Sequence, residues 1–204
     1  MMDSTEEIEK LFGSLLDKKR LNDLLHFYNK GTRFSMSSFL DFFRIKYIAP
    51  GNAAKTELNE QSVDFHTSYN VLEHISPKVL KGIFEEGNRI ISKNGLFIHR
   101  IDYSDHFSHS DKTISAINFL QYSDSEWDKY AGNRYMYMNR LRHDDFLNIF
   151  RRAGHRILVN EPDVDQRSLE LMRAGGVQFD ERFKAKSEEV LSIISSWVVA
   201  QRQP

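Results

Sequence analysis

Between residues 62 and 91 the hydrophobic pattern changes from a period of two to helical spacing. Residues 62–69 alternate between polar side chains and apolar or aromatic ones, which is the pattern of a β-strand. Ser76 and Pro77 suit the N-cap and the first position of a helix. Residues 77–91 then carry one apolar stripe at helical spacing, and Gly87 on that stripe predicts a close approach of the helix to a sheet.

A second strand is expected directly after this helix. Asn94-Gly95 favours a helix end, because both residues adopt the left-handed cap conformation easily. Residues 96–101 form a short apolar run, typical of a strand covered on both faces. Strand, helix and strand together predict a right-handed βαβ crossover.

The rest of the chain shows weaker patterns of the same two kinds. Apolar stripes predict helices in residues 5–28 and 144–153. Together with the βαβ unit, we expect an α/β sheet with strands near residues 45–49, 63–69, 95–101, 155–160 and 193–200.

Composition excludes several classes of function. Lys plus Arg (28) and Asp plus Glu (29) nearly balance, so the net charge of −1 argues against a protein that coats nucleic acid. Without cysteine, the chain has no disulfide, thiol nucleophile or cysteine-bound metal. The first ten residues are acidic and polar, unlike a signal peptide, and no run of apolar residues is long enough to span a membrane. We expect a soluble cytoplasmic protein.

Two segments together suggest a family. The strings DFHTSYNVLEHI and RIISKNGLFIHRID resemble the second half of class I S-adenosylmethionine-dependent methyltransferases, and the resemblance covers roughly residues 45–202. It implies a Rossmann-like sheet whose last strand is antiparallel, with S-adenosylmethionine as cofactor. It also implies a methyltransferase-like α/β domain (45–204) with an aromatic, lid-like insertion (107–142), preceded by an N-terminal helical segment (1–44) that the apolar stripes predict.

The glycine-rich turn expected after the first strand of this family is absent. None of the ten glycines forms a G-x-G, and no strand is evident before Ile45. The chain thus resembles a methyltransferase without its first two strands, as a truncated or degenerate copy. A missing N-terminal segment or a partner chain would have to complete it.

The resemblance places donor contacts at two positions. Asn52 and Ala53 match the loop that meets the adenine after the family's third strand, with Asn where Asp is commoner. A plain Pro-Gly-Asn turn explains the same residues equally well. Ser68, Tyr69 and Asn70, at the end of the next strand, are the other expected donor contacts.

Candidate catalytic residues follow the second strand of the βαβ unit. Asp102, Asp105 and His106 lie where open α/β sheets bind ligands, and a carboxylate can orient a histidine that acts as a base. A polar turn with Asp as a helix cap is the alternative. A metal cluster that includes His99 is disfavoured, because His99 and Asp102 lie on opposite sides of an ideal strand.

Glu73 and His74 raise a separate question of metal binding. Some quinone-pathway O-methyltransferases bind a divalent ion with such a pair and an acidic residue three positions earlier. That earlier position is Asn70 here, so we expect no metal, Glu73 as a hydrogen-bond acceptor in the loop, and His74 on the substrate side or packed at a helix start.

The insertion and the residues after it complete the candidate site. Its aromatic side chains are expected to cover a flat or sugar-like acceptor, or else to form a satellite core. Arg140 and Arg142 are candidates to hold an anionic part of the substrate, with two unliganded surface arginines as the alternative.

We therefore expect methyl transfer to an oxygen or nitrogen of a small molecule or saccharide. The alternative is a catalytically inactive methyltransferase-like module that acts by protein–protein interaction, through the surface that the absent strands would cover. Another nucleotide-binding α/β enzyme, such as a dehydrogenase, fits the VLEH turn less well.

Overall fold

The structure is a computed structural model that describes residues 7, 9–10, 13–15, 17–29, 35–133 and 135–203. The chain divides into two compact units, Met1–Pro50 and Gly51–Pro204. Each unit is described by itself below. In the described parts of the chain, no helix is long and apolar enough to cross a membrane.

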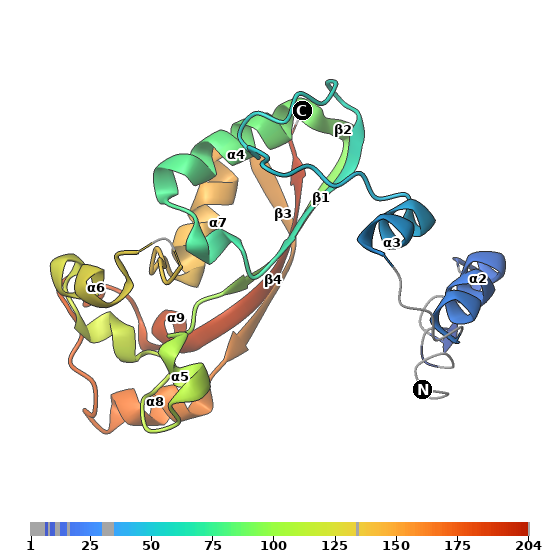
Figure 1. The fold of residues 1–204 in the computed structure, drawn as a ribbon. Coiled ribbons are helices and arrows are strands. Elements are labelled where there is room, and N and C mark those ends of the chain that lie inside the picture. The colour runs from blue at the N-terminus through green and yellow to red at the C-terminus, as the bar shows by residue number, and fades with distance from the viewer. Residues whose placement is uncertain are drawn as a thin grey trace. The chain divides into compact units, whose positions relative to one another are not determined.

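The first unit contains the helices η1 (Gly13–Leu15), α2 (Lys18–Asn29) and α3 (Met36–Phe43) (Figure 1). Ser35 caps α3 by accepting a hydrogen bond from the Ser38 amide, and Arg44 ends the helix in the left-handed conformation.

The strand predicted at residues 45–49 is wrong, because this segment has no regular structure. Its apolar side chains are largely exposed, Tyr47 at 74% and Ile48 at 54%. A short apolar run becomes a strand only where another strand pairs with it, and no pairing in the described chain involves these residues.

The second unit holds the sheet and the remaining helices. Its elements in chain order are β1 (Val63–Tyr69), η2 (Leu72–His74), α4 (Pro77–Ile90), β2 (Ile91–Asp102), α5 (Phe107–Ser110), η3 (Asn118–Gln121), α6 (Asp124–Ala131), α7 (His143–Arg152), β3 (His155–Val164), α8 (Gln166–Arg173), α9 (Glu188–Ser192) and β4 (Ile193–Arg202).

The four strands form one sheet in the order β1-β2-β4-β3 (Figure 1). β1 and β2 are parallel, whereas β4 runs antiparallel to both of its neighbours. The predicted central place of residues 96–101 and the antiparallel last strand are confirmed, and so is the Rossmann-like fold class.

Helices α4 and α7 cover one face of the sheet (Figure 1). Their aromatic side chains Phe84, Phe146 and Phe150 form a core with Phe97 and Ile101 of β2, all of them at most 1% exposed. A Cβ atom on Gly87 would lie 2.8 Å from the Phe97 ring, so glycine lets α4 approach the sheet as predicted.

The predicted helix end at Asn94-Gly95 is wrong. α4 ends at Ile90, and both Asn94 and Gly95 belong to β2. A Cβ atom on Gly95 would lie 2.7 Å from the Ile91 side chain and 2.9 Å from the Asp64 carbonyl oxygen. Glycine is therefore needed here for a close approach between β1 and β2, where the strand register shifts.

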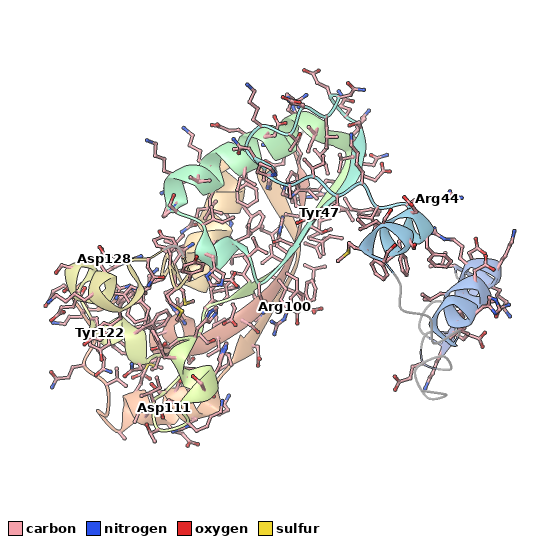
Figure 2. All side chains as sticks on the ribbon, viewed as in Figure 1. Arg44, Tyr47, Arg100, Asp111, Tyr122 and Asp128 are labelled. Carbon is pink, nitrogen blue, oxygen red and sulfur yellow. The ribbon has the colours of Figure 1, made fainter. Side chains whose placement is uncertain are left out.

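The expectation that β2 is covered on both faces is also wrong within Gly51–Pro204. Phe97, His99 and Ile101 are buried, whereas the alternate residues of β2 are only half-buried. Figure 2 shows Arg100 on this second face. The large side chains exposed on the sheet are Phe65, Tyr69, Leu158, Val159, Val164 and Trp197.

The segment from Phe107 to Arg142 packs mainly into a second core. Phe119, Leu120 and Trp127 are buried with Leu169 of α8 and Phe183, which agrees with the satellite-core alternative for these aromatic residues. Tyr130 and Tyr135 are exposed at 56% and 75%.

Candidate functional site

A group of polar side chains meets at the carboxyl ends of the parallel strands β1 and β2. η2, which follows β1, supplies Glu73 and His74, and the residues at and after the end of β2 supply Asp102 and His106. Both strands run toward the part of the unit that contains α5 and α9 (Figure 1). The sequence argument that placed ligand-binding residues after β2 therefore agrees with the topology.

Asp102 is the carboxylate beside His106. Its Oδ2 lies 3.6 Å from His106 Nε2 and 3.9 Å from His109 Nε2. Its Oδ1 accepts hydrogen bonds from the Ser104 amide (2.8 Å) and hydroxyl (2.6 Å). Burial raises the pKa of Asp102, but the interaction with His106 and the bonds from Ser104 outweigh it and leave that pKa lowered. Asp102 in turn raises the pKa of His106.

Glu73 is a buried carboxylate, only 2% exposed. Neither of its side-chain oxygens has a hydrogen-bond partner, and His106 Nε2 is likewise buried without one. Burial raises the pKa of Glu73 to about 7, and the neighbouring Asp102 carboxylate adds to the shift. Glu73 thus stands out as an unpaired polar group in the interior.

Asp105 is held by local hydrogen bonds. Its Oδ1 accepts from the Phe107 amide at 2.9 Å, and its Oδ2 accepts from the Asn118 side chain at 3.2 Å. These bonds fit the alternative in which Asp105 caps a turn. The carboxylate that the structure places beside His106 is Asp102.

Asn139 and Tyr137 hold the loop that carries Glu73 and His74. Asn139 donates from its side chain to the carbonyl oxygens of Leu72 and Ile75, each at 2.9 Å. His74 Nδ1 lies 2.8 Å from the Tyr137 carbonyl oxygen. The segment after α6 therefore fixes the orientation of the His74 ring.

Arg140 and Arg142 are both buried, and each donates to backbone carbonyl oxygens. Arg142 is fully buried and donates to the carbonyl oxygens of Tyr103, Leu191 (2.8 Å) and Ile193 (2.6 Å). Burial lowers its pKa to about 10.

Arg140 is 3% exposed, donates to the carbonyl oxygens of Phe119 and Tyr122, and pairs with Asp124. Both guanidinium groups thus tie segments of the protein together.

The side chains predicted to contact the donor are engaged within the chain. Ser68 Oγ lies 2.7 Å from His99 Nδ1, and Asn70 Oδ1 accepts from Arg100 at 3.1 Å. The Tyr69 ring lies under the Arg100 guanidinium, 5.2 Å from its centroid.

Asn52 and Ala53 do not follow a strand. The Asn52 side chain accepts from the Ala54 amide in a local turn, and Ala54 packs against Gly82 of α4.

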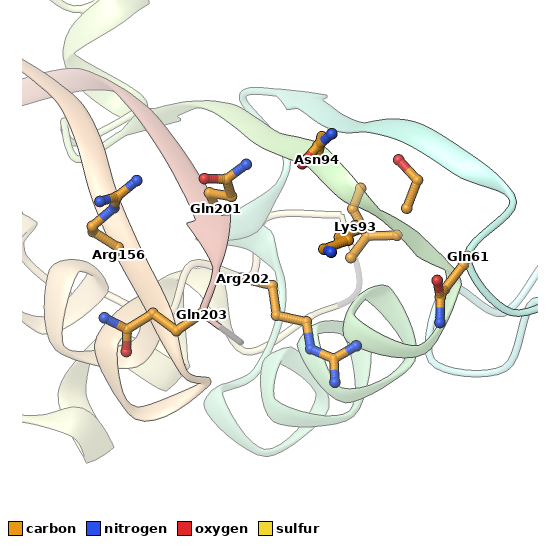
Figure 3. A pocket seen from close by; sticks show the side chains of 9 residues that line it. Gln61, Lys93, Asn94, Arg156, Gln201, Arg202 and Gln203 are labelled. Carbon is orange, nitrogen blue, oxygen red and sulfur yellow. The ribbon is translucent and has the colours of Figure 1, made fainter.

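A pocket of about 710 Å³ lies at the opposite end of the sheet, near the start of β2 and the end of β4. Figure 3 shows its basic side chains, Lys93, Arg156 and Arg202, among amide side chains. It contains none of the residues predicted from the sequence, and its position does not match the ligand-binding end of the sheet.

Sequence reasoning singled out Glu73, but only as a hydrogen-bond acceptor in the loop, and it did not single out Ser104 or His109. Glu73 interrupts the apolar run of NVLEHI, and this was the available signal. Its burial depends on Asn139, which is distant in the sequence and bonds the same loop. Ser104 and His109 contact each other and Asp102 only because the chain turns after β2.

Known proteins resemble this chain in structure and not in sequence. No protein-family model and no curated protein sequence gave a match. The PH0226 protein from Pyrococcus horikoshii aligns with a TM-score of 0.50 at 12% identity, over 82% of this chain and 65% of that one. An S-adenosylmethionine-dependent methyltransferase from Methanosarcina mazei aligns with a TM-score of 0.44 at 12% identity, over 74% and 64%.

A third structure, described as a possible histamine N-methyltransferase from Thermotoga maritima, aligns with a TM-score of 0.44 at 13% identity, over 80% and 69%. The present chain spans less than two thirds of the length of the first two proteins.

The chain has a class I methyltransferase-like fold. In this methyltransferase-like unit, the Glu73–His106 cluster occupies the carboxyl ends of the parallel strands, where α/β folds of this kind bind ligands.

Proposed function

We propose that the chain acts as an S-adenosylmethionine-dependent methyltransferase on an oxygen or nitrogen of a small molecule or saccharide. One observation carries the proposal: buried polar atoms of Glu73 and His106 lack partners at the carboxyl ends of β1 and β2. Polar atoms in the interior are normally paired, so unpaired ones at a ligand-binding position point to a missing ligand. The acceptor is the ligand proposed for this position.

The chain's own residues bind and orient the acceptor. His106 lines the position proposed for the acceptor, its Nε2 lies 3.6 Å from Asp102 Oδ2 without a hydrogen bond, and Ser104 fixes Asp102. Such a site contributes by positioning, because a correctly held acceptor no longer has to find its reactive geometry by diffusion. S-Adenosylmethionine, when bound, supplies the methyl group.

The end of β1 has the right location for the donor, but its side chains are not free to bind it. The end of β1 lies beside the cluster, but the side chains of Ser68, Tyr69 and Asn70 already interact with His99 and Arg100. Among the described residues, no glycine directly follows β1 or β2. We therefore expect the donor to bind weakly to this chain.

Methyl transfer with radiolabelled donor at millimolar concentration tests the function on a panel of hydroxy and amino acceptors. We expect His106→Ala to lower turnover by roughly 10²-fold or more, since it removes a group that touches the acceptor. Lys81→Gln on the outer surface of α4, 79% exposed, is the matched control and should keep the wild-type rate. An unchanged rate in His106→Ala, with an intact circular dichroism spectrum, would contradict the proposal.

The alternative function, an inactive module that binds a partner polypeptide, is favoured by a different observation. Phe65 and Tyr69 of β1 are 60% and 62% exposed, and in the described chain β1 pairs on one side only. Strand edges of this kind add strands from other chains. In this alternative, the partner polypeptide adds a strand to the free edge of β1. Phe65→Asp should then abolish the association of this chain with that partner, as measured by light scattering.

A further inference from the structure

The sheet opens between β2 and β4 at the end where β2 begins. β4 pairs with β3 as far as Arg202, but its pairing with β2 stops at Ala200. Within the described chain, residues 91–96 of β2 therefore have no partner strand on the side of β4. The pocket of about 710 Å³ lies at this opening, and Figure 3 shows side chains of β2 and β4 around it.

A bulge in β2 forms one wall of the pocket. Opposite the single residue Asp64 of β1, β2 has the four residues 92–95. Bulges redirect side chains and interrupt strand pairing, and they often lie beside functional sites. Ser92, Lys93 and Asn94 of this bulge line the pocket.

The lining of the pocket is positively charged. It contains Lys93, Arg156 and Arg202, and among the described residues that line it there is no Asp or Glu. Within the described part of the chain, none of the three cations forms an ion pair. Asp64 approaches from outside the lining, where its Oδ1 accepts from the Ser92 hydroxyl at 3.1 Å. The positive charge in the pocket thus has no protein counter-charge in direct contact.

The two arginines reach the pocket from opposite faces of the sheet. Arg156 pairs with Gln201, and Arg202 pairs with His155. Successive residues of a strand point to opposite faces, so the two guanidinium groups come from different sides. Arg202 Nη1 also donates to the Asn88 carbonyl oxygen at 2.9 Å, which ties this side chain to the end of α4. A ligand in the opening would therefore meet a guanidinium group on either side.

We propose that this pocket binds a small organic phosphate that carries hydroxyl groups, such as a sugar phosphate. Arg and Lys are the side chains that bind phosphate groups most strongly. Amide side chains both donate and accept hydrogen bonds, which suits hydroxyl groups. The lining contains four of them: Gln61, Asn94, Gln201 and Gln203. A volume of about 710 Å³ is typical of a small-molecule site.

Nucleotides and nucleic acids fit this lining less well. None of the described lining residues is aromatic, and the apolar one, Ile91, is only 1% exposed. A base would therefore find no surface on which to stack. Nucleic-acid binding also needs an extended basic surface, whereas these cations gather in one pocket of a chain with a net charge of −1.

Isothermal titration calorimetry of the full chain, with any affinity tag removed, tests the site. The probes are fructose 1,6-bisphosphate and glucose 6-phosphate. We expect the bisphosphate to bind with a Kd below about 1 mM, and more weakly as the salt concentration rises.

Two variants test whether the cations of the pocket hold the probe. Lys93→Gln and Arg156→Gln should each weaken binding of the bisphosphate at least about 10-fold, because each removes a charge-assisted hydrogen bond. Lys78→Gln, at an exposed position at the start of α4, removes the same charge elsewhere and should bind as the wild type does. Both pocket variants change exposed side chains, so their circular dichroism spectra should match that of the wild type.

Further probes separate the chemical classes of ligand. Fructose should not bind detectably, and inorganic phosphate should bind at least about 10-fold more weakly than the bisphosphate, because it lacks the hydroxyl groups. The proposal would be overturned if neither sugar phosphate binds, or if Lys93→Gln and Arg156→Gln both bind as the wild type does. Citrate or a single-stranded oligonucleotide that binds more tightly than the bisphosphate would also overturn it. The pocket lies at the opposite end of the sheet from the Glu73–His106 cluster, and no methyl transfer is measured, so the result is independent of the proposed function.

Discussion

Arg142 is a fully buried cation whose partners are backbone carbonyl groups. It joins Tyr103, which follows β2, to Leu191 at the end of α9 and Ile193 at the start of β4. Carbonyl oxygens of two segments that are distant in the sequence thus share one donor group. The guanidinium takes the place of water at these three buried carbonyl oxygens.

Replacing Arg142 with Met should lower the free energy of unfolding by at least about 3 kcal/mol, because each buried carbonyl left without a donor costs about 1–3 kcal/mol. Urea denaturation measures the change. Arg152→Met, an exposed residue at the end of α7, is the control and should stay within about 0.5 kcal/mol of the wild type. Unchanged stability together with a raised KM in Arg142→Met would instead favour the original prediction that Arg142 holds the substrate.

The sequence could not have distinguished these two roles for Arg142. Arginines at positions 140 and 142 suggest an anion-binding site. Their spacing in the sequence does not indicate the carbonyl groups to which they donate. Glu73 presents the same difficulty, since its burial depends on Asn139. The position of Asp102 and His106 was predictable because it follows from the end of a strand.

Between the sheet and the helices α4 and α7 lies a cluster of three histidines, one each from β1, β2 and β3. His66 Nδ1 is 3.3 Å from His99 Nε2, and the His155 ring stacks on Phe97 at 4.2 Å. Burial lowers the pKa of all three, that of His99 to about 3 and that of His155 to about 4. The ring interactions that hold the helices against the sheet therefore involve uncharged imidazoles.

Stability should fall as the pH drops below about 6.5, the pKa of histidine in an unfolded chain. The unfolded chain binds protons there, whereas the folded chain does not until the pH approaches the lowered values. By pH 5 the loss is on the order of 2 kcal/mol for each of His99 and His155. The other charged group that faces the cluster, Arg202, lowers the pKa of His155 further.

Urea denaturation between pH 7.5 and 5 tests this expectation. His99→Gln should flatten the dependence on pH, and His26→Gln, at an exposed position in α2, should not. A His99→Gln variant with the wild-type slope would show that these rings do not control the response to acid.

Elements with strong periodicity were predictable from the sequence, and isolated short patterns were not. The strand at residues 63–69 and the helices α4 and α7 appear where the spacing of apolar residues indicated them. Residues 45–49 have the composition of a strand, but strand formation depends on a neighbour that a local pattern cannot reveal. At Asn94-Gly95 the glycine serves the close approach to Asp64 and does not end a helix.

For the molecule as a whole, the sheet and the Glu73–His106 cluster are present, while the side chains expected to contact the donor, Ser68, Tyr69 and Asn70, interact with other residues of the chain. We expect S-adenosylhomocysteine to bind residues 1–204 with a Kd weaker than about 0.1 mM, because few polar groups remain to offset the entropy lost on binding. Isothermal titration calorimetry measures this Kd. Micromolar affinity would show that the chain carries a donor site that the fold does not suggest.

The central position of β4 governs when the sheet can assemble. Phe97 pairs with Ala200, so β2 obtains its second neighbour only from residues 193–202, which follow β3 in the chain. During synthesis on a ribosome, β3 therefore emerges before β4, the strand that joins it to β2. Contacts between such distant residues slow folding, and a nascent chain would expose the unpaired β3 and one free edge of β2 until β4 emerges. A stop codon before residue 193 would leave β2 and β3 without the strand that joins them.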